Sequence, residues 1–270
     1  MKVFFIGAGP GDPELLTLKA ARIIGRAELI LYAGSLVSPL VLQHAGRGAL
    51  VKDSSTLTLE QTHALLVRTV RAGGLAARVH TGDPSVYGAI EEQIELLRRD
   101  GIDFEIVPGV TAAFAAAAAA AAPLTSPGRS QSFVLTRAAG RTPVPEGGRI
   151  GDLAGPGRSM AIYLSAADPS GVYAELRRAG LPDSSPVIIA HAVGWPDECL
   201  CRTTLGSLVA ETLRRGFTRQ TLYLVLPEAC TQTQRSRLYA ADFGHGFREA
   251  SDDVRAGSDP DAGGTARGDH

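Results

Sequence analysis

Two glycine-rich loops, each carrying an aspartate, constrain the fold of this chain more than any other feature. One spans residues 7–13 (Gly-Ala-Gly-Pro-Gly-Asp-Pro) and the other residues 82–88 (Gly-Asp-Pro-Ser-Val-Tyr-Gly). Each follows an apolar run, 3–6 or 75–79, and each precedes a stretch with helical spacing. A strand, a glycine turn and a helix start together form a ligand site at the carboxyl edge of a parallel sheet. The two loops therefore predict an α/β fold with a ligand at this edge.

The first loop departs from the dinucleotide-binding fingerprint. Asp12 stands where a Gly-x-Gly-x-x-Gly pattern starting at Gly7 requires its last glycine, and its charge would repel a pyrophosphate. Pro10 and Pro13 remove two backbone N–H donors that a pyrophosphate would need. The second predicted strand ends in Tyr-Ala-Gly, without the acidic residue that would bind a ribose. The loop therefore disfavours NAD and FAD and favours a ligand without phosphate.

Composition indicates an enzyme-sized soluble chain. With 270 residues, 44% hydrophobic and 20% charged, it is long enough for a sizeable core and two domains. A formal net charge of −1 gives no support for a nucleic-acid partner. Apolar runs fall short of a membrane span, and Met1-Lys2 leads directly into a predicted strand. We therefore expect a cytoplasmic protein with no membrane or nucleic-acid partner.

Cysteine and histidine are not spaced like metal ligands. Cys199 and Cys201 have no second pair or nearby histidine to complete a site. A Gly-x-Ser-x-Gly elbow and a Walker loop are also missing from the sequence. We therefore expect no metal, and the sequence identifies no catalytic residue or general base.

Strand and helix signals alternate along the first part of the chain, which predicts a mostly parallel sheet with helices on both faces. The predicted strands span 3–6, 28–32, 49–51, 75–80 and 104–107, and the predicted helices 14–25, 38–45, 59–72 and 88–99. Residues 112–122 are alanine except for Phe114, so they predict a further helix, which Pro123 ends.

A second set of elements follows. The predicted strands span 132–136, 159–164, 186–191 and 221–226, and the predicted helices 169–179 and 206–215. Residues 140–157 are rich in glycine and proline and predict a long surface loop. Residues 249–270 contain one large apolar residue, Val254, and predict a disordered tail. The predicted domains are therefore an N-terminal α/β domain, 1–112, and a C-terminal α/β domain, 113–248.

Taken in order, these motifs resemble the tetrapyrrole methylase family, whose members transfer a methyl group from S-adenosylmethionine. The resemblance covers about residues 2–248. The segments that carry it are 3–17, 82–88, 107–112, 123–125, 161–165 and 195–198. It implies two α/β domains with the cofactor in the cleft between them, a tetrapyrrole substrate and a homodimer.

Three further segments, 32–37, 140–146 and 237–248, resemble the members that methylate C11 of precorrin-4 or cobalt-precorrin-4 in cobalamin biosynthesis. The resemblance therefore implies an S-adenosylmethionine-dependent C-methyltransferase. It also implies cofactor contacts, carried over position by position. These are Pro10, Thr81, Gly82, Asp83, Val86, Thr111 and Ala112 in the first domain, and Leu164, Val193 and Leu222 in the second.

Methyl transfer from a sulfonium mainly requires alignment and exclusion of water, so it needs neither a triad nor a metal. The implied substrate is a polycarboxylate, which guanidinium groups bind well. Arg129, Arg137 and Arg141, at the start of the second domain, are therefore the candidates for substrate binding.

Three other functions remain open from the sequence. A sister tetrapyrrole methylase would act at another ring carbon. A ribose methyltransferase of ribosomal RNA would use the same fold and should show a basic face, which the balanced charge disfavours. A catalytically silent cofactor-binding subunit would keep the loops without turnover. The sequence also leaves open whether the substrate carries a metal.

Overall fold

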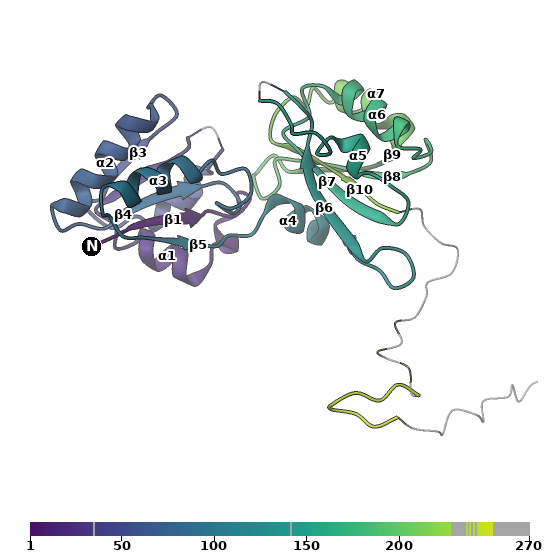
Figure 1. Cartoon of the computed structure of the whole chain (residues 1–270), viewed down its shortest axis with the longest axis horizontal. Coiled ribbons are helices and arrows are strands. Elements are labelled where there is room, and N and C mark those ends of the chain that lie inside the picture. The colour runs from purple at the N-terminus through teal and green to yellow at the C-terminus, as the bar shows by residue number, and fades with distance from the viewer. Residues whose placement is uncertain are drawn as a thin grey trace, which may run out of the picture. The chain divides into compact units, whose positions relative to one another are not determined.

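The structure is a computed structural model that describes residues 1–34, 36–140, 142–227 and 242–250, together with Ser236, Leu238 and Ala240 (Figure 1). The chain divides into a large compact unit, Met1–Glu228, and a small unit, Ala229–His270. Within the described ranges, no helix combines the length and the apolar character needed to cross a bilayer.

The large unit begins with a five-stranded sheet in the order β3-β2-β4-β1-β5, in which every pairing is parallel. Its strands are β1 (Val3–Gly7), β2 (Leu29–Tyr32), β3 (Leu50–Asp53), β4 (Ala76–His80) and β5 (Phe104–Val107). The predicted parallel sheet is confirmed. Because β1 lies between β4 and β5, the loops that follow these three strands meet at one edge.

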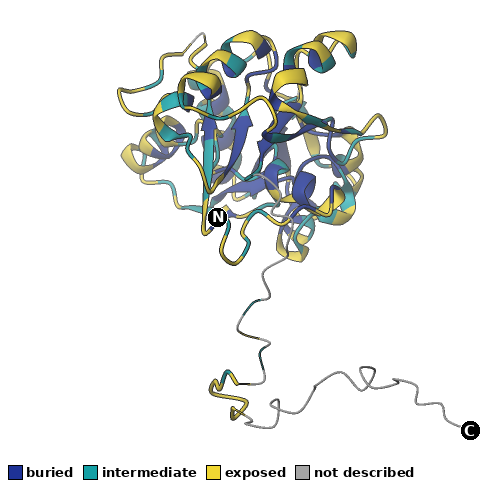
Figure 2. Ribbon diagram, turned by 90° about the vertical axis from the view of Figure 1, so that its right-hand side faces the viewer, coloured by how far each residue is buried: buried dark blue, intermediate teal, exposed yellow. Residues whose placement is uncertain are grey.

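Helices cover both faces of this sheet. α1 (Leu18–Ile24) packs on the face that contains Phe4 and Ile6. α2 (Leu59–Arg71) and α3 (Glu91–Arg99) pack on the face that contains Val3 and Phe5. Alternate side chains of a strand point to opposite faces, so a strand covered on both sides is apolar throughout. Figure 2 shows the central strands buried and the outer sides of the helices exposed.

Caps decide where the helices begin. Thr58 starts α2 with a capping box that it shares with Gln61. The helix predicted at 14–25 is instead two elements, a 3-10 turn η1 (Pro13–Leu15) and α1, because Asp12 caps the first and Thr17 the second. The helix predicted at 38–45 is a 3-10 helix, η2 (Pro39–His44), which begins at the cap Ser38.

The second sheet of the large unit has the order β6-β7-β10-β8-β9. Only β6 and β7 are parallel, and the other pairings are antiparallel. Its strands are β6 (Ser132–Arg137), β7 (Arg158–Tyr163), β8 (Pro186–His191), β9 (Cys199–Thr204) and β10 (Thr221–Val225). Two elements were not predicted, namely β9 and a short helix, α5 (Ile150–Leu153), inside the predicted loop 140–157.

Two different layers cover the second sheet. α5, α6 (Pro169–Arg178) and α7 (Leu208–Arg214), with the 3-10 turn η3 (Leu205–Ser207), pack on one face. The alanine-rich α4 (Ala112–Ala119) packs on the other, where Ala113 and Ala116 meet Ala161 and Ala190. Small side chains on both sides let this helix approach the sheet closely.

The predicted domain boundary after residue 112 falls at the start of α4 and stays a prediction.

In the small unit, the guanidinium of Arg248 donates to the carbonyls of Leu238, Ala240 and Phe243 at 2.9, 2.7 and 3.0 Å. Of the predicted disordered tail, residues 251–270 lie outside the described residues.

Candidate functional site

Three glycines bring the loops after β1, β4 and β5 into contact. A Cβ at Gly7 would lie 2.5 Å from the Gly109 nitrogen, and a Cβ at Gly109 would lie 2.1 Å from the Gly82 carbonyl oxygen. Gly82 N donates to Gly9 O at 2.7 Å, which joins the two loops. Both distances are shorter than a Cβ tolerates, so Gly7 and Gly109 have to be glycine.

Asp83 holds two of these loops together. Its Oδ1 accepts a hydrogen bond from Ser85 N at 2.8 Å and closes the turn after β4. Its Oδ2 accepts from Gly109 N at 2.9 Å in the loop after β5. The carboxylate is therefore engaged by backbone donors on both oxygens.

A loop from the second sheet contacts the first glycine loop. The indole Nε1 of Trp195 donates to Pro10 O at 3.0 Å. A Cβ at Gly11 would lie 2.4 Å from Trp195 Cδ1, and a Cβ at Gly194, whose φ is +77°, would lie 2.7 Å from Asp12 N. The two loops therefore fit together only because each has a glycine at the contact.

These loops enclose a cavity of about 650 Å³. It is lined by the loops after β1, β2 and β4, by the start of α4, and by residues at or after the ends of β7 and β8 and around the start of β10. All ten residues that the family resemblance assigns to the cofactor line this one cavity: Pro10, Thr81, Gly82, Asp83, Val86, Thr111, Ala112, Leu164, Val193 and Leu222.

Strained backbone is concentrated around this cavity. Tyr87, Leu164, Ala192 and Gln220 all line it, and their φ angles are 54°, 54°, 49° and 49°. Residues other than glycine seldom adopt positive φ, and such strain gathers at functional sites. The strain therefore supports a functional role for the cavity.

Tyr163, at the end of β7, joins the second sheet to α4. Its hydroxyl accepts from Ala113 N at 3.0 Å and is hydrogen-bonded to Thr111 Oγ1. The N-cap Thr111 makes no side-chain cap of its own, so the tyrosine satisfies an N–H group of the first turn of α4. Burial raises the pKa of Tyr163, and the phenol therefore stays protonated at neutral pH.

Of the predicted substrate arginines, the two that the structure describes, Arg129 and Arg137, do not line the cavity. Arg129, at the amino end of β6, donates to Pro227 O at 3.2 Å. Arg137, at the other end of β6, donates to the carbonyls of Ala138, Thr142 and Pro143. Arg137 nevertheless lies beside the cavity, because it is close to two tyrosines that line it. It pairs in register with Tyr163, and its positive charge opposes the rise that burial causes in the pKa of Tyr87. Arg141 lies outside the described residues.

Eleven of the described residues that line the cavity were not identified from the sequence. They are Leu36, Tyr87, Tyr163, Ala166, Ala190, Ala192, Trp195, Thr218, Arg219, Gln220 and Thr221. Three kinds of signal could have pointed to some of them. Tyr87 belongs to the second glycine loop, Trp195 belongs to the motif at 195–198, and a polar run at 218–221 leads into β10.

The cavity suits a largely apolar ligand that is held by backbone groups. Among the described residues that line it, Asp83 and Arg219 are the only charged ones. Its other described lining residues are aliphatic, aromatic or glycine, except for Gln220 and four threonines. Such a site can align two reactants and exclude water, which are the requirements for transferring an activated group.

The chain matches the family model of the tetrapyrrole (corrin/porphyrin) methylases over residues 2–209. It is 44% identical to the cobalt-precorrin-4 C(11)-methyltransferase of Priestia megaterium over 92% of this chain and 98% of that protein. It is 45% identical to the precorrin-4 C(11)-methyltransferase of Pseudomonas aeruginosa over 92% and 99%.

Solved structures agree with these relatives. The X-ray structure of a cobalt precorrin-4 methyltransferase, a cobalamin biosynthetic enzyme, matches with a TM-score of 0.81 and 44% identity, over 83% of this chain and 94% of that one. A uroporphyrin-III C-methyl transferase from Thermus thermophilus, complexed with S-adenosyl homocysteine, matches with a TM-score of 0.69 and 28% identity, over 83% and 92%. This chain therefore belongs to the tetrapyrrole (corrin/porphyrin) methylase family.

Proposed function

We propose that this chain transfers a methyl group from S-adenosylmethionine to C11 of precorrin-4 or cobalt-precorrin-4 in cobalamin biosynthesis, and that it does so in the cytoplasm. The observation that carries the proposal is the single cavity lined by all ten residues that the resemblance assigns to the cofactor. The precorrin-4 C(11)-methyltransferases that match over 92% of this chain support the regiochemistry. The neighbour complexed with S-adenosyl homocysteine supports the cofactor.

The residues present fit this cofactor. At Gly82, which lines the cavity, a Cβ would lie no closer than 3.7 Å to other atoms, so the glycine is there for its φ of +60°. Pro10 and Pro13 reduce the N–H donors of the first loop, which suits a ligand without phosphate. Leu164, Val193 and Leu222 supply apolar contacts from the second sheet.

When bound, the sulfonium of S-adenosylmethionine supplies an activated methyl group. The protein then has to align that group with a ring carbon and keep water out. Asp83 contributes by fixing the loops after β4 and β5, and Tyr163 by fixing the start of α4 against β7. We further propose that Arg137, beside the cavity, contacts a substrate carboxylate. We do not extend that role to Arg129, which lies at the opposite end of β6.

The test is mass spectrometry of the products formed from purified precorrin-4, or its cobalt form, with methyl-labelled S-adenosylmethionine. We expect one added methyl group, at C11 by carbon-13 NMR. Methylation at another ring carbon would indicate a sister enzyme. Cofactor binding without turnover would indicate a silent subunit, and transfer to ribosomal RNA would indicate a ribose methyltransferase.

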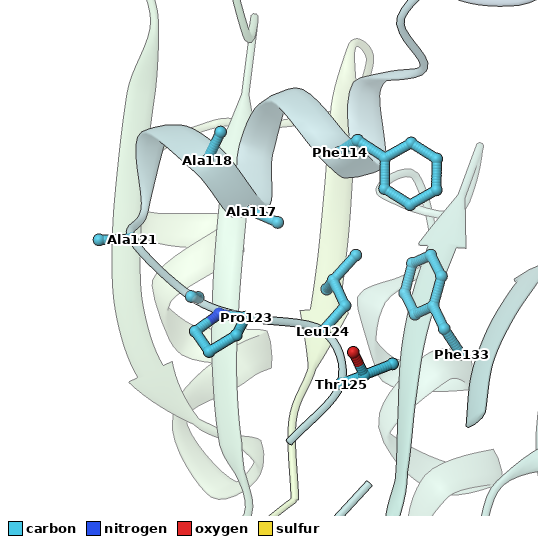
Figure 3. Close-up of a pocket in the computed structure, with 9 residues that line it drawn as sticks. Phe114, Ala117, Ala118, Ala121, Pro123, Leu124, Thr125 and Phe133 are labelled. Carbon is cyan, nitrogen blue, oxygen red and sulfur yellow. The ribbon is translucent and has the colours of Figure 1, made fainter. Parts of the chain in front are cut away.

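We also propose that the chain forms a homodimer, because one apolar hollow lies on its surface. The hollow, of about 640 Å³, is lined by α4, the segment that follows it and Phe133 of β6, without a charged residue among the described lining. Figure 3 shows Phe114 next to Phe133, with Leu124 and Thr125 beside them. The ring centroids of the two phenylalanines are 5.8 Å apart, and Phe114 is 53% exposed. Exposed apolar surfaces of this kind are typical of protein interfaces.

Analytical ultracentrifugation tests the dimer. Ala118, exposed on α4, lines the hollow, and we expect Ala118→Glu to convert the dimer to a monomer. Leu213→Glu is the control, because Leu213 is 65% exposed on α7 and does not line the hollow. A wild-type monomer, or equal dissociation of the two variants, would refute this interface.

A further inference from the structure

Arg219 is the only cation among the described residues that line the cavity. It is exposed, and its guanidinium forms no hydrogen bond or ion pair within the described part of the chain. The other charged lining residue, Asp83, has both oxygens engaged by backbone N–H groups. Among its described lining residues, the cavity therefore presents one charge without a partner, and that charge is positive.

The backbone around Arg219 is held firmly. Thr221 Oγ1 donates to Arg219 O at 2.8 Å, and His191 Nδ1 lies 2.9 Å from the same hydroxyl. Ala192 N donates to Gln220 O at 2.8 Å, although Gln220 has a strained φ of 49°. The turn therefore fixes the backbone from which the Arg219 side chain extends, and such strain is retained where it serves a function.

We propose that Arg219 binds a carboxylate of the ligand in this cavity and thereby determines specificity. A guanidinium suits this task because it can form two parallel N–H···O bonds with a carboxylate. The inference rests on the proposed function, which brings two sources of carboxylate to the site. One is the amino-acid part of the cofactor, and the other is the acidic side chains of the tetrapyrrole.

Calorimetric titration separates the two sources. S-adenosylhomocysteine carries the amino-acid carboxylate, whereas 5′-methylthioadenosine lacks it. If the cofactor is the source, Arg219→Gln weakens binding of S-adenosylhomocysteine at least tenfold and leaves methylthioadenosine unchanged. If the substrate is the source, binding of both nucleosides is unchanged, and the KM for the tetrapyrrole rises at least tenfold with little change in kcat.

Two variants complete the experiment. Arg219→Lys keeps the positive charge but lacks the two parallel N–H donors of a guanidinium, so it should restore part of the affinity or of the KM. Arg68→Gln, an exposed change on α2 away from the cavity, is the matched control and should alter neither quantity. If the wild type binds S-adenosylhomocysteine but Arg219→Gln matches it in both affinities and in KM, this inference is overturned while the proposed function stands. A wild type that neither binds nor methylates would overturn both.

Discussion

The indole nitrogen of Trp195 and the carbonyl oxygen of Pro10 are 3.0 Å apart, although the two residues are 185 positions apart in the chain. Their hydrogen bond joins the loop after β8 to the loop after β1, and both residues line the cavity. Since the chain has one tryptophan, this contact also provides an intrinsic probe of the site.

Trp195→Phe keeps an aromatic ring but leaves Pro10 O without this donor. We expect binding of S-adenosylhomocysteine to weaken about fivefold, since a net hydrogen bond contributes about 1 kcal/mol. In the wild type, titration with the same ligand should change the tryptophan emission. Tyr173→Phe is the control, because it removes the exposed hydrogen bond that Tyr173 on α6 donates to Asp183. An unchanged emission at saturating ligand would show that the ligand does not bind near Trp195.

The close contact between the Gly82 and Gly109 loops gives a second prediction. A methyl group at Gly109 would meet Gly82 O at 2.1 Å, so Gly109→Ala has to displace a loop. We expect it to reduce the free energy of unfolding by about 1–3 kcal/mol, as overpacking does, and to abolish cofactor binding. Gly140→Ala is the matched control, because nothing lies within 4 Å of its Cβ position and its φ is not positive. Urea denaturation measures the free energy of unfolding of both variants, and calorimetry measures their cofactor binding. Equal stability of the two variants would refute the close contact between the loops.

The first sheet could be predicted from the sequence because its strands alternate with helical stretches, and its central strands β1, β2 and β4 are mostly buried. β9 could not, because an edge strand is covered less and does not need an apolar sequence. Its residues Cys-Leu-Cys-Arg-Thr-Thr include one that is buried, Cys201. The helix at 14–25 was predicted as continuous because two caps, Asp12 and Thr17, lie only five positions apart.

The cavity residues likewise divide into those that sequence motifs could assign and those that they could not. Those in the glycine loops belong to contiguous motifs, so a resemblance could assign them position by position. Tyr163 and Trp195 act through contacts with Thr111 and Pro10 that only the tertiary fold creates. Arg219 lies in a turn without a recognised motif, and the polar run at 218–221 does not by itself identify it as a cavity residue.

Asp83→Asn should be more disruptive than its small change in shape suggests. The carboxylate accepts one N–H group on each oxygen, whereas an amide has a single acceptor oxygen and would turn its NH2 toward the other donor. We expect a loss of about 1–3 kcal/mol in the free energy of unfolding and weaker binding of S-adenosylhomocysteine. Asp168, the N-cap of α6, accepts a backbone hydrogen bond on one oxygen, which an asparagine can also do. Asp168→Asn should therefore leave the free energy of unfolding nearly unchanged. Similar losses in the two variants would argue against the two-donor role.

His80 should make the protein less stable in acid. Burial, with the nearby charge of Arg78, lowers the pKa of His80 to about 3, whereas an unfolded histidine titrates at about 6.5. Between these values the unfolded chain binds a proton that the folded chain does not, so the free energy of unfolding falls as the pH decreases from about 6.5 toward 3. His80→Phe should reduce the difference in unfolding free energy between pH 7.5 and pH 5, and His44→Gln is the control. An equal pH dependence in wild type and His80→Phe would contradict this role.

Truncations should separate residues 237–248 from the tail. Arg248 binds three carbonyls of its own segment, and His245 and Arg248 form an antiparallel bridge, so this stretch keeps its hydrogen bonds when the chain ends at Arg248. We expect truncation after Arg248 to leave methyl transfer and the melting temperature unchanged. Truncation after Arg235 removes the stretch that resembles the C11-methylating members and should lower methyl transfer. Binding of S-adenosylhomocysteine should persist in both, because every described residue that lines the cavity precedes the cuts. Equal turnover of the two truncated proteins would show that the segment is not needed for reaction at C11.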